Sequence, residues 1–384
     1  MQSFTLARIP EIVFGNGRAA ELPAFAAAHA GQGARVILIA DPALGAAGIT
    51  AAIAAAFTAA GHETVIYDRF SGEPKYRNID DASALARDAG ARAVIGLGGG
   101  TALDTAKLVA ACAVSGKPVE AYQFCETPLP VEPLPLIAVP TTAGTGAEVT
   151  RTSIFSNSRG EKVWAWGDAL KPRLAVLDPE LTVGVPAGVT GATALDALVH
   201  AIEACTNRNR HDANDLYCHR AISLIAGHLE KAIRNPGDRD ARGALLLASC
   251  YAGIGIDNCG TALAHNISHA MADLAPIPHG RATGLAMLAT IDWVKDGNPA
   301  AYAAVARAMG SAAGAAQSVE AFERLVRASG IRLSLAGEGL ELNRPDLLAE
   351  RMASPAHRPM RANTVREVSD ADLLMLAQRV YALT

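Results

Sequence analysis

The stretch Ala93–Lys107 reads Ala-Val-Ile-Gly-Leu-Gly-Gly-Gly-Thr-Ala-Leu-Asp-Thr-Ala-Lys, a short buried strand whose glycines lead directly into a helix. Adjacent glycines let a backbone approach a phosphate closely, and a helix N-terminus presents free N–H groups and a partial positive charge. The stretch is neither the usual dinucleotide fingerprint nor a Walker A loop, because Lys107 lies too far along the helix. Taken alone, it fits a phosphate-binding turn and a tight structural turn equally well.

Strands and helices alternate on both sides of this stretch. Val36–Ala40 is a continuous apolar run, as expected for a parallel strand buried on both faces, and Leu136–Val139 is a further strand. Helical patterns cover Ile49–Ala60 and Ile79–Ala89. The alternation predicts a parallel α/β sheet.

The α/β half ends near residue 184. Extended pieces at Ser153–Phe155 and Lys162–Trp166 predict a hairpin, and after this half alanine-rich helical periodicity replaces the strands. A chain of 384 residues is also long for a single core. We therefore predict two domains, an α/β domain over residues 1–184 and a helical domain over residues 185–384.

A second small, hydroxyl-rich turn, Thr141–Gly146, follows the strand at Leu136–Val139. Two such turns at the carboxyl ends of adjacent strands form a credible crevice for a diphosphate. Asp41 ends an earlier strand, where a ribose-hydroxyl acceptor would stand, and a carboxylate there favours a free 2′-hydroxyl over a 2′-phosphate. A helix N-cap in Asp41-Pro42 is an equally good interpretation of this residue. The α/β domain is thus expected to bind a dinucleotide.

The helical half contains Asp196 and His200 four residues apart in an apolar segment, and His265 and His269 with the same spacing. In helices, the members of each pair face the same way. Burying a carboxylate among apolar neighbours is costly unless it is paired or binds a cation. Imidazole nitrogen and carboxylate oxygen suit iron(II) or zinc. A metal site that also draws on His279 is therefore favoured over separate core histidines.

A dinucleotide-binding half and a metal-binding half with a cleft between them predict hydride transfer. In such an enzyme the metal is a Lewis acid that lowers the pKa of an alcohol and orients its carbon toward the nicotinamide. Hydride would then pass between the nicotinamide and a metal-bound alkoxide or carbonyl.

Charge, hydropathy and cysteine content argue against nucleic-acid-binding, membrane and disulfide-rich proteins. A formal net charge of -4 offers no general field for nucleic acid or an anionic membrane. The sequence has no apolar run of membrane-spanning length and no signal-peptide pattern at its start, which predicts a cytoplasmic location. The six cysteines are scattered without a Cys-x-x-Cys pair, as expected for reduced thiols.

Five motifs lie within a resemblance that runs from about residue 11 to 366, nearly the whole chain: Gly98-Gly99-Gly100-Thr101-x-x-Asp104-x-x-Lys107, Pro140-Thr141-Thr142-Ala143-Gly144-Thr145-Gly146-Ala147-Glu148-Val149-Thr150, Asp178-Pro179-Glu180-Leu181, Asp196-x-x-x-His200-Ala201-Ile202-Glu203-Ala204, and His265-x-x-x-His269 with His279-Gly280. In this combination the chain resembles the iron-containing (group III) alcohol dehydrogenases. The resemblance implies the dehydroquinate synthase-like fold (α/β plus all-α), with an N-terminal Rossmann-like parallel sheet domain and a C-terminal helical domain. It also implies an NAD-dependent alcohol dehydrogenase or aldehyde reductase that uses a divalent metal, usually Fe(II) and sometimes zinc. A small-molecule alcohol or aldehyde substrate and a homodimer or larger homo-oligomer follow from the same resemblance.

The resemblance further implies roles for individual residues. It assigns the metal to Asp196, His200, His265 and His279. His269 matches an extra histidine near metal and substrate that helps to relay the proton, so His265 and His269 are the residues predicted to be catalytic. Asp41 matches the position associated with preference for NAD over NADP. The implied cofactor-binding residues are Asp41, Gly98, Gly99, Thr101, Asp104, Thr141, Thr142, Thr145 and Lys162.

Alternatives within the same fold remain open. A maleylacetate reductase or a short hydroxy-acid dehydrogenase would take an anionic substrate, for which Arg358 and Arg361 are candidate contacts, although two solvated loop arginines are the more common interpretation. A dehydroquinate synthase-like lyase would need a site rich in lysine and arginine near the metal. The helical half between His200 and His279 is poor in lysine, which argues against the lyase.

Overall fold

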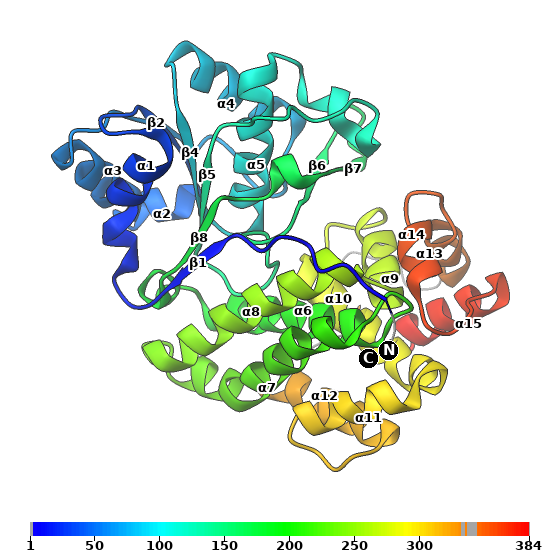
Figure 1. Ribbon diagram of the computed structural model, residues 1–384. Coiled ribbons are helices and arrows are strands. Elements are labelled where there is room, and N and C mark those ends of the chain that lie inside the picture. Colours follow the sequence, from blue (N-terminus) through cyan, green and yellow to red (C-terminus); the bar gives the residue numbers. More distant parts are fainter. Residues whose placement is uncertain (1–2, 332–334, 336–343, 384) are drawn as a thin grey trace. The chain divides into compact units, whose positions relative to one another are not determined.

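The computed structural model describes residues 3–331, 335 and 344–383, which form two compact units. The sheet unit comprises Arg8–Thr142 and Ala147–Val183, and the helical unit comprises the described residues of Met1–Ala7, Ala143–Gly146 and Gly184–Thr384. Figure 1 shows the sheet unit in blue to green and most of the helical unit in green to red.

The sheet unit is built on six parallel strands in the order β1-β8-β5-β4-β2-β3. The strands are β1 (Glu11–Phe14), β2 (Val36–Ala40), β3 (Thr64–Tyr67), β4 (Ala93–Gly98), β5 (Leu136–Pro140) and β8 (Leu174–Leu177). The order β3-β2-β4-β5-β8 is that of a doubly wound sheet with strand order 2-1-3-4-5, whose ligand crevice lies at the switch point between the first and third strands. The predicted parallel α/β sheet is confirmed, and its switch point lies between β2 and β4.

Helices cover both faces of this sheet. They are α1 (Leu22–Ala30), α2 (Pro42–Ala46), α3 (Ile49–Ala59), α4 (Tyr76–Asp88) and α5 (Gly100–Ser115), with short 3-10 turns η1 (Arg18–Glu21), η2 (Val119–Cys125), η3 (Asp168–Leu170) and η4 (Pro179–Thr182). Val36 and Leu38 pack in one core with α1 and α3, whereas Ile37 and Ile39 pack in another with α4 and α5. Because successive residues of a strand face opposite cores, the strands are apolar throughout.

The predicted hairpin is also confirmed: β6 (Thr152–Ser156) and β7 (Lys162–Trp166) pair antiparallel. A buried lysine ties this hairpin to α5. Lys107 Nζ donates to Thr150 Oγ1 at 2.9 Å and to the Thr152 carbonyl at 2.8 Å, and it lies 3.3 Å from Asp104 Oδ1. The other carboxylate oxygen of Asp104 accepts the Ile154 N–H at 3.0 Å.

The helical unit contains α6 (Ala187–Thr206), α7 (Asp212–Arg234), α8 (Arg239–Cys259), α9 (Leu263–Ala272), α10 (His279–Val294), η5 (Lys295–Gly297), α11 (Pro299–Ala308), α12 (Ala315–Ala328), α13 (Pro345–Met352), α14 (Arg358–Asn363) and α15 (Asp370–Tyr381). Helix α6 is central, since it packs against α7, α8 and α10, and its second half is buried. Prolines at 276 and 278 separate α9 from α10, because proline cannot continue a helix. No helix in the described ranges is long and apolar enough to cross a membrane.

Candidate functional site

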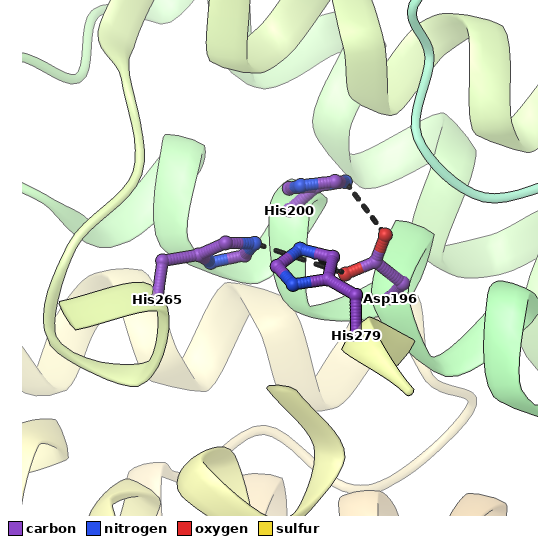
Figure 2. A group of neighbouring side chains, drawn as sticks. All are labelled: Asp196, His200, His265 and His279. Atoms are coloured by element: carbon purple, nitrogen blue, oxygen red, sulfur yellow. Dashed lines mark ion pairs between the residues drawn. The ribbon is translucent and has the colours of Figure 1, made fainter. Parts of the chain in front are cut away.

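Four side chains from three helices of the helical unit point toward one another (Figure 2). Asp196 and His200 lie on α6, His265 lies on α9, and His279 is the first residue of α10. Each offers one ligand atom, and these atoms all lie within 4.8 Å of one another. Three of the residues are buried and His279 is half-buried. The four ligands that the sequence motifs imply are therefore neighbours in the fold.

The spacing of the four groups fits a bound ion. Asp196 Oδ2 lies 3.9 Å from His200 Nδ1, and Asp196 Oδ1 lies 3.8 Å from His265 Nε2 and 3.5 Å from His279 Nε2. These separations are too long for hydrogen bonds. Ligand atoms bound tetrahedrally at about 2.0–2.2 Å from a zinc ion lie about 3.4 Å apart. Within the described chain, His200 Nδ1 and His265 Nε2 are also buried without a hydrogen-bond partner, and a divalent cation would supply one.

The electrostatics of the site favour the protonation states that bind metals. Burial alone would raise the pKa of Asp196, but the imidazoles of His200, His279 and His265 lower it below its ordinary value. Burial holds the pKa of His265 well below its ordinary value and lowers that of His200 as well. An ionised carboxylate and neutral imidazoles are the forms that coordinate a metal.

Close helix packing positions His279. A Cβ on Gly280 would lie 2.2 Å from the Ala192 carbonyl oxygen of α6, so only glycine allows the start of α10 to approach α6 this closely. The contact brings His279 beside Asp196. The hydroxyl of Thr283, one turn later on α10, lies 2.9 Å from Asp196 Oδ1 and 2.6 Å from the His279 carbonyl oxygen, so its one hydrogen is shared between these two acceptors beside the carboxylate.

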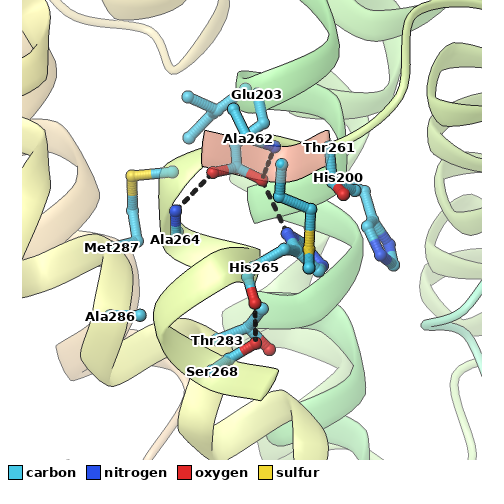
Figure 3. Close-up of polar contacts among 12 residues, drawn as sticks. His200, Glu203, Thr261, Ala262, Ala264, His265, Ser268, Thr283, Ala286 and Met287 are labelled. Atoms are coloured by element: carbon cyan, nitrogen blue, oxygen red, sulfur yellow. Dashed lines mark hydrogen bonds and ion pairs between the residues drawn. The ribbon is translucent and has the colours of Figure 1, made fainter. Parts of the chain in front are cut away.

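Sequence reasoning did not single out Glu203. This buried residue of α6 accepts the N–H groups of Ala262 at 2.8 Å and Ala264 at 2.6 Å, and its Oε2 lies 2.6 Å from His265 Nδ1 (Figure 3). Burial raises the pKa of Glu203 to about 7, while its backbone N–H partners and the nearby histidines act in the opposite direction. Its spacing could have revealed it, because a residue three after His200 and seven after Asp196 lies on the same face of a helix.

His269 lies beside the four candidate ligands but is not one of them. Its ring centroid is 5.4 Å from that of His279 and 6.2 Å from that of His265. On another side it meets the ring of His357, whose Nε2 lies 2.8 Å from Asp273 Oδ2. His269 is thus next to the site, as the sequence motifs imply.

In the sheet unit, the first predicted turn lies beside the start of the second, Thr141 and Thr142, at the carboxyl ends of β4 and β5. The Thr141 N–H donates to the Gly98 carbonyl at 3.0 Å, and a Cβ on Gly99 would lie 3.1 Å from Thr142 Oγ1. A Cβ on Gly98 (φ +148°) would lie 2.9 Å from Cβ of Asp41 at the end of β2. Gly99 precedes α5, whose first N–H groups no side chain caps in the described chain. These free donors suit an anion.

Asp41 and Thr101 make local contacts at these turns. Asp41 caps α2 through Oδ1, which accepts the Ala43 N–H at 2.9 Å, so the N-cap interpretation is realised. Thr101 Oγ1 donates to the Gly72 carbonyl at 2.9 Å. Thr145 belongs to the short stretch Ala143–Gly146, which groups with the helical unit.

Two other predicted cofactor residues are engaged elsewhere in the sheet unit. The Asp104 carboxylate contacts Lys107 and the backbone of β6, and Lys162 Nζ lies 2.6 Å from Glu73 Oε1. Of the two candidate anion contacts, Arg361 binds the Val368 carbonyl and Asp370, whereas Arg358 is exposed.

Two family models match the chain. The model described as "Iron-containing alcohol dehydrogenase" matches residues 10–179, and the model described as "Fe-containing alcohol dehydrogenase family, C-terminal" matches residues 190–381. Together they cover both units.

Similar proteins match over most of their length. The chain is 32% identical over 360 residues to long-chain-alcohol dehydrogenase 1 of Geobacillus thermodenitrificans. This alignment covers 91% of this chain and 90% of that protein. It is 30% identical over 327 residues to the NAD-dependent methanol dehydrogenase of Bacillus methanolicus, covering 82% and 85% of the two chains. Sulfoacetaldehyde reductase of Bifidobacterium kashiwanohense, solved in complex with NAD+, superposes with a TM-score of 0.92 at 27% identity over 100% of both chains.

Proposed function

This chain belongs to the iron-containing alcohol dehydrogenase family, and from that membership we propose that it catalyses NAD(H)-dependent, divalent-metal-dependent interconversion of a small alcohol and its aldehyde or ketone. The membership confirms the resemblance seen in the motifs and the expectation of an oxidoreductase. The observation that carries the proposal is the group of one carboxylate and three imidazoles whose ligand atoms lie within 4.8 Å of one another.

In this proposal Asp196, His200, His265 and His279 hold the metal. When bound, the metal supplies Lewis acidity, which makes the alcohol oxygen more acidic and polarises the carbonyl. Asp196 contributes the negative charge among these ligands, and Thr283 keeps its carboxylate aimed into the site. His269 takes or returns the proton of the substrate hydroxyl beside His279.

NAD occupies the turns at the carboxyl ends of β2, β4 and β5 in this proposal. Gly98, Gly99, Thr141 and Thr142 accommodate the diphosphate with the N-terminal N–H groups of α5. The second carboxylate oxygen of Asp41 accepts from the ribose. The remaining contacts come from Thr101, Thr145 and Lys162, and Asp104 acts by fixing α5 to the hairpin. In this proposal residues 1–184 form the cofactor domain and residues 185–384 the catalytic domain, apart from the described residues of Met1–Ala7 and Ala143–Gly146, which group with the helical unit.

The substrate class is drawn from the relatives. The two dehydrogenases named above act on alcohols, and the sulfoacetaldehyde reductases of Bifidobacterium kashiwanohense and Bilophila wadsworthia act on an acidic aldehyde. Neutral and acidic aldehydes are therefore both included in the test. The protein acts in the cytoplasm as a homodimer or larger homo-oligomer.

The test follows NADH oxidation across neutral and acidic aldehydes and ketones, using chelated protein reloaded anaerobically with iron(II), zinc or nothing. We expect turnover only with a metal, and the preferred substrate separates a neutral-alcohol enzyme from an acid-substrate reductase. Equal turnover with and without metal would contradict the proposed metal dependence. NADH binding without turnover on any substrate would favour a lyase.

A further inference from the structure

Glu203 contacts His265, one of the proposed metal ligands, at the ring nitrogen that is not proposed to bind the metal. Its two carboxylate oxygens lie within hydrogen-bond distance of three nitrogens, the backbone nitrogens of Ala262 and Ala264 and Nδ1 of His265. Figure 3 shows Glu203 reaching from α6 to the first turn of α9, with the imidazole of His265 below it. The residue is 3% exposed, so these nitrogens replace water as its partners.

This arrangement determines which nitrogen of His265 carries the proton. An ionised Glu203 can only accept, and each of its oxygens already accepts a backbone N–H, Oε2 from Ala262 and Oε1 from Ala264, so His265 Nδ1 meets Oε2 as a further donor. His265 Nδ1 then keeps its hydrogen toward Glu203, and the lone pair lies on Nε2. That nitrogen is 3.8 Å from Asp196 Oδ1 and has no hydrogen-bond partner in the described part of the chain.

Charge adds a second effect. Of the four proposed ligands only Asp196 is anionic, so a divalent cation in this buried site would keep one uncompensated positive charge. A carboxylate that accepts from the far nitrogen of a ligating imidazole makes the ring a stronger donor, and such partners typically change metal affinity by about 10–100-fold. Ionised Glu203 would supply the second negative charge.

We propose that Glu203 is a positioning residue for metal binding: it fixes His265 as the tautomer with a free Nε2 and balances the charge of the cation through the ring. The inference rests on the proposed metal site. A purely structural role for Glu203, as an anchor for the start of α9, predicts a loss of stability without a change in the tautomer of His265 or in metal affinity.

The test measures zinc affinity of the metal-free, full-length protein by competition with a chromophoric chelator. Glu203→Gln is close in size, but its amide donates toward His265 Nδ1 and shifts the ring proton to Nε2. We expect zinc affinity to fall by about 10–100-fold. Glu203→Asp retains the charge with a shorter reach, and its zinc affinity should lie between that of the parent and that of Glu203→Gln. Glu148→Gln, the same change at a buried carboxyl of the sheet unit, is the matched control and should bind zinc as the parent does.

His265→Ala separates the two hypotheses. If it leaves zinc affinity unchanged, the proposed metal site fails. If it weakens zinc binding while Glu203→Gln binds within twofold of the parent, only the role of Glu203 fails. Should Glu203→Gln not fold, as judged by circular dichroism, the ¹⁵N shifts of the histidine rings in the metal-free parent decide, with His265→Ala for assignment. The Nδ1–H tautomer of His265 supports the inference, and the Nε2–H tautomer overturns it.

Discussion

The two candidate sites of this molecule are built from different materials. In the helical unit, side chains from α6, α9 and α10 converge and their ligand atoms define the site. In the sheet unit, the turns after β4 and β5 offer mainly backbone N–H groups. The residues there are chiefly small, and glycines among them leave space because they have no Cβ. A side-chain site therefore depends on the identity of each ligand, whereas a backbone site depends on the space left open.

The largest effect is expected in the helical unit. His265→Ala should remove the metal and lower turnover by about 10³-fold, since several kcal/mol of Lewis-acid stabilisation are lost. Metal content by elemental analysis and NADH turnover should fall together, while NADH binding, measured by fluorescence, stays. Retention of both metal and turnover would show that the ligand assignment is wrong.

Asp104→Ala tests whether a charged residue in the sheet unit acts on the cofactor or on the fold. Lys107 is fully buried and would lose its anionic partner, so the free energy of unfolding should fall by about 3 kcal/mol. Urea unfolding measures this loss, and a titration with NADH well below the melting temperature measures binding. Weakened NADH binding at unchanged stability would instead make Asp104 a direct cofactor contact.

Gly280→Ala asks how closely the helices must approach for the side-chain site to form. The added methyl group would overlap the Ala192 carbonyl and push the start of α10 away, at a cost of about 1–3 kcal/mol. Because this shift displaces His279, zinc affinity should also fall. Gly188→Ala is the matched control, because a Cβ there meets nothing within 4 Å and the helix gains stability. If the two variants bind zinc alike, the close packing does not position His279.

Asp41→Gly should have the smallest effect. It removes the carboxylate that would repel a 2′-phosphate, so the ratio of kcat/KM for NAD over NADP should fall by about tenfold, which corresponds to about 1.4 kcal/mol. Because Asp41 also caps α2, a small loss of thermal stability is expected as well. An unaltered ratio would mean that Asp41 serves only as the cap.

The sequence predicted the features that depend on local pattern. Continuous apolar runs such as Val36–Ala40 identified parallel strands because both faces of this sheet are covered, and the spacing of Asp196 and His200 identified one face of α6. Contacts between distant segments could not be read from linear spacing. The spacing of Glu203 places it on the ligand face of α6, but its contact with His265 becomes visible only when α9 is placed beside it, and Gly280 looks like any helical glycine until Ala192 is found beside it.

The first strand of the sheet has its partner far away along the chain. Glu11 pairs with Leu174, and the described residues of Met1–Ala7, shortly before this strand, belong with the helical unit, where Phe4 stacks on His211 and the Ala7 N–H donates to Asn258. Because synthesis proceeds from the amino end, β1 is made long before β8, and Phe4 and Ala7 are made long before His211 and Asn258. Until these later residues are made, β1 and the segment before it remain open to other partners. β1 therefore cannot complete its place in the sheet until β8 has been made.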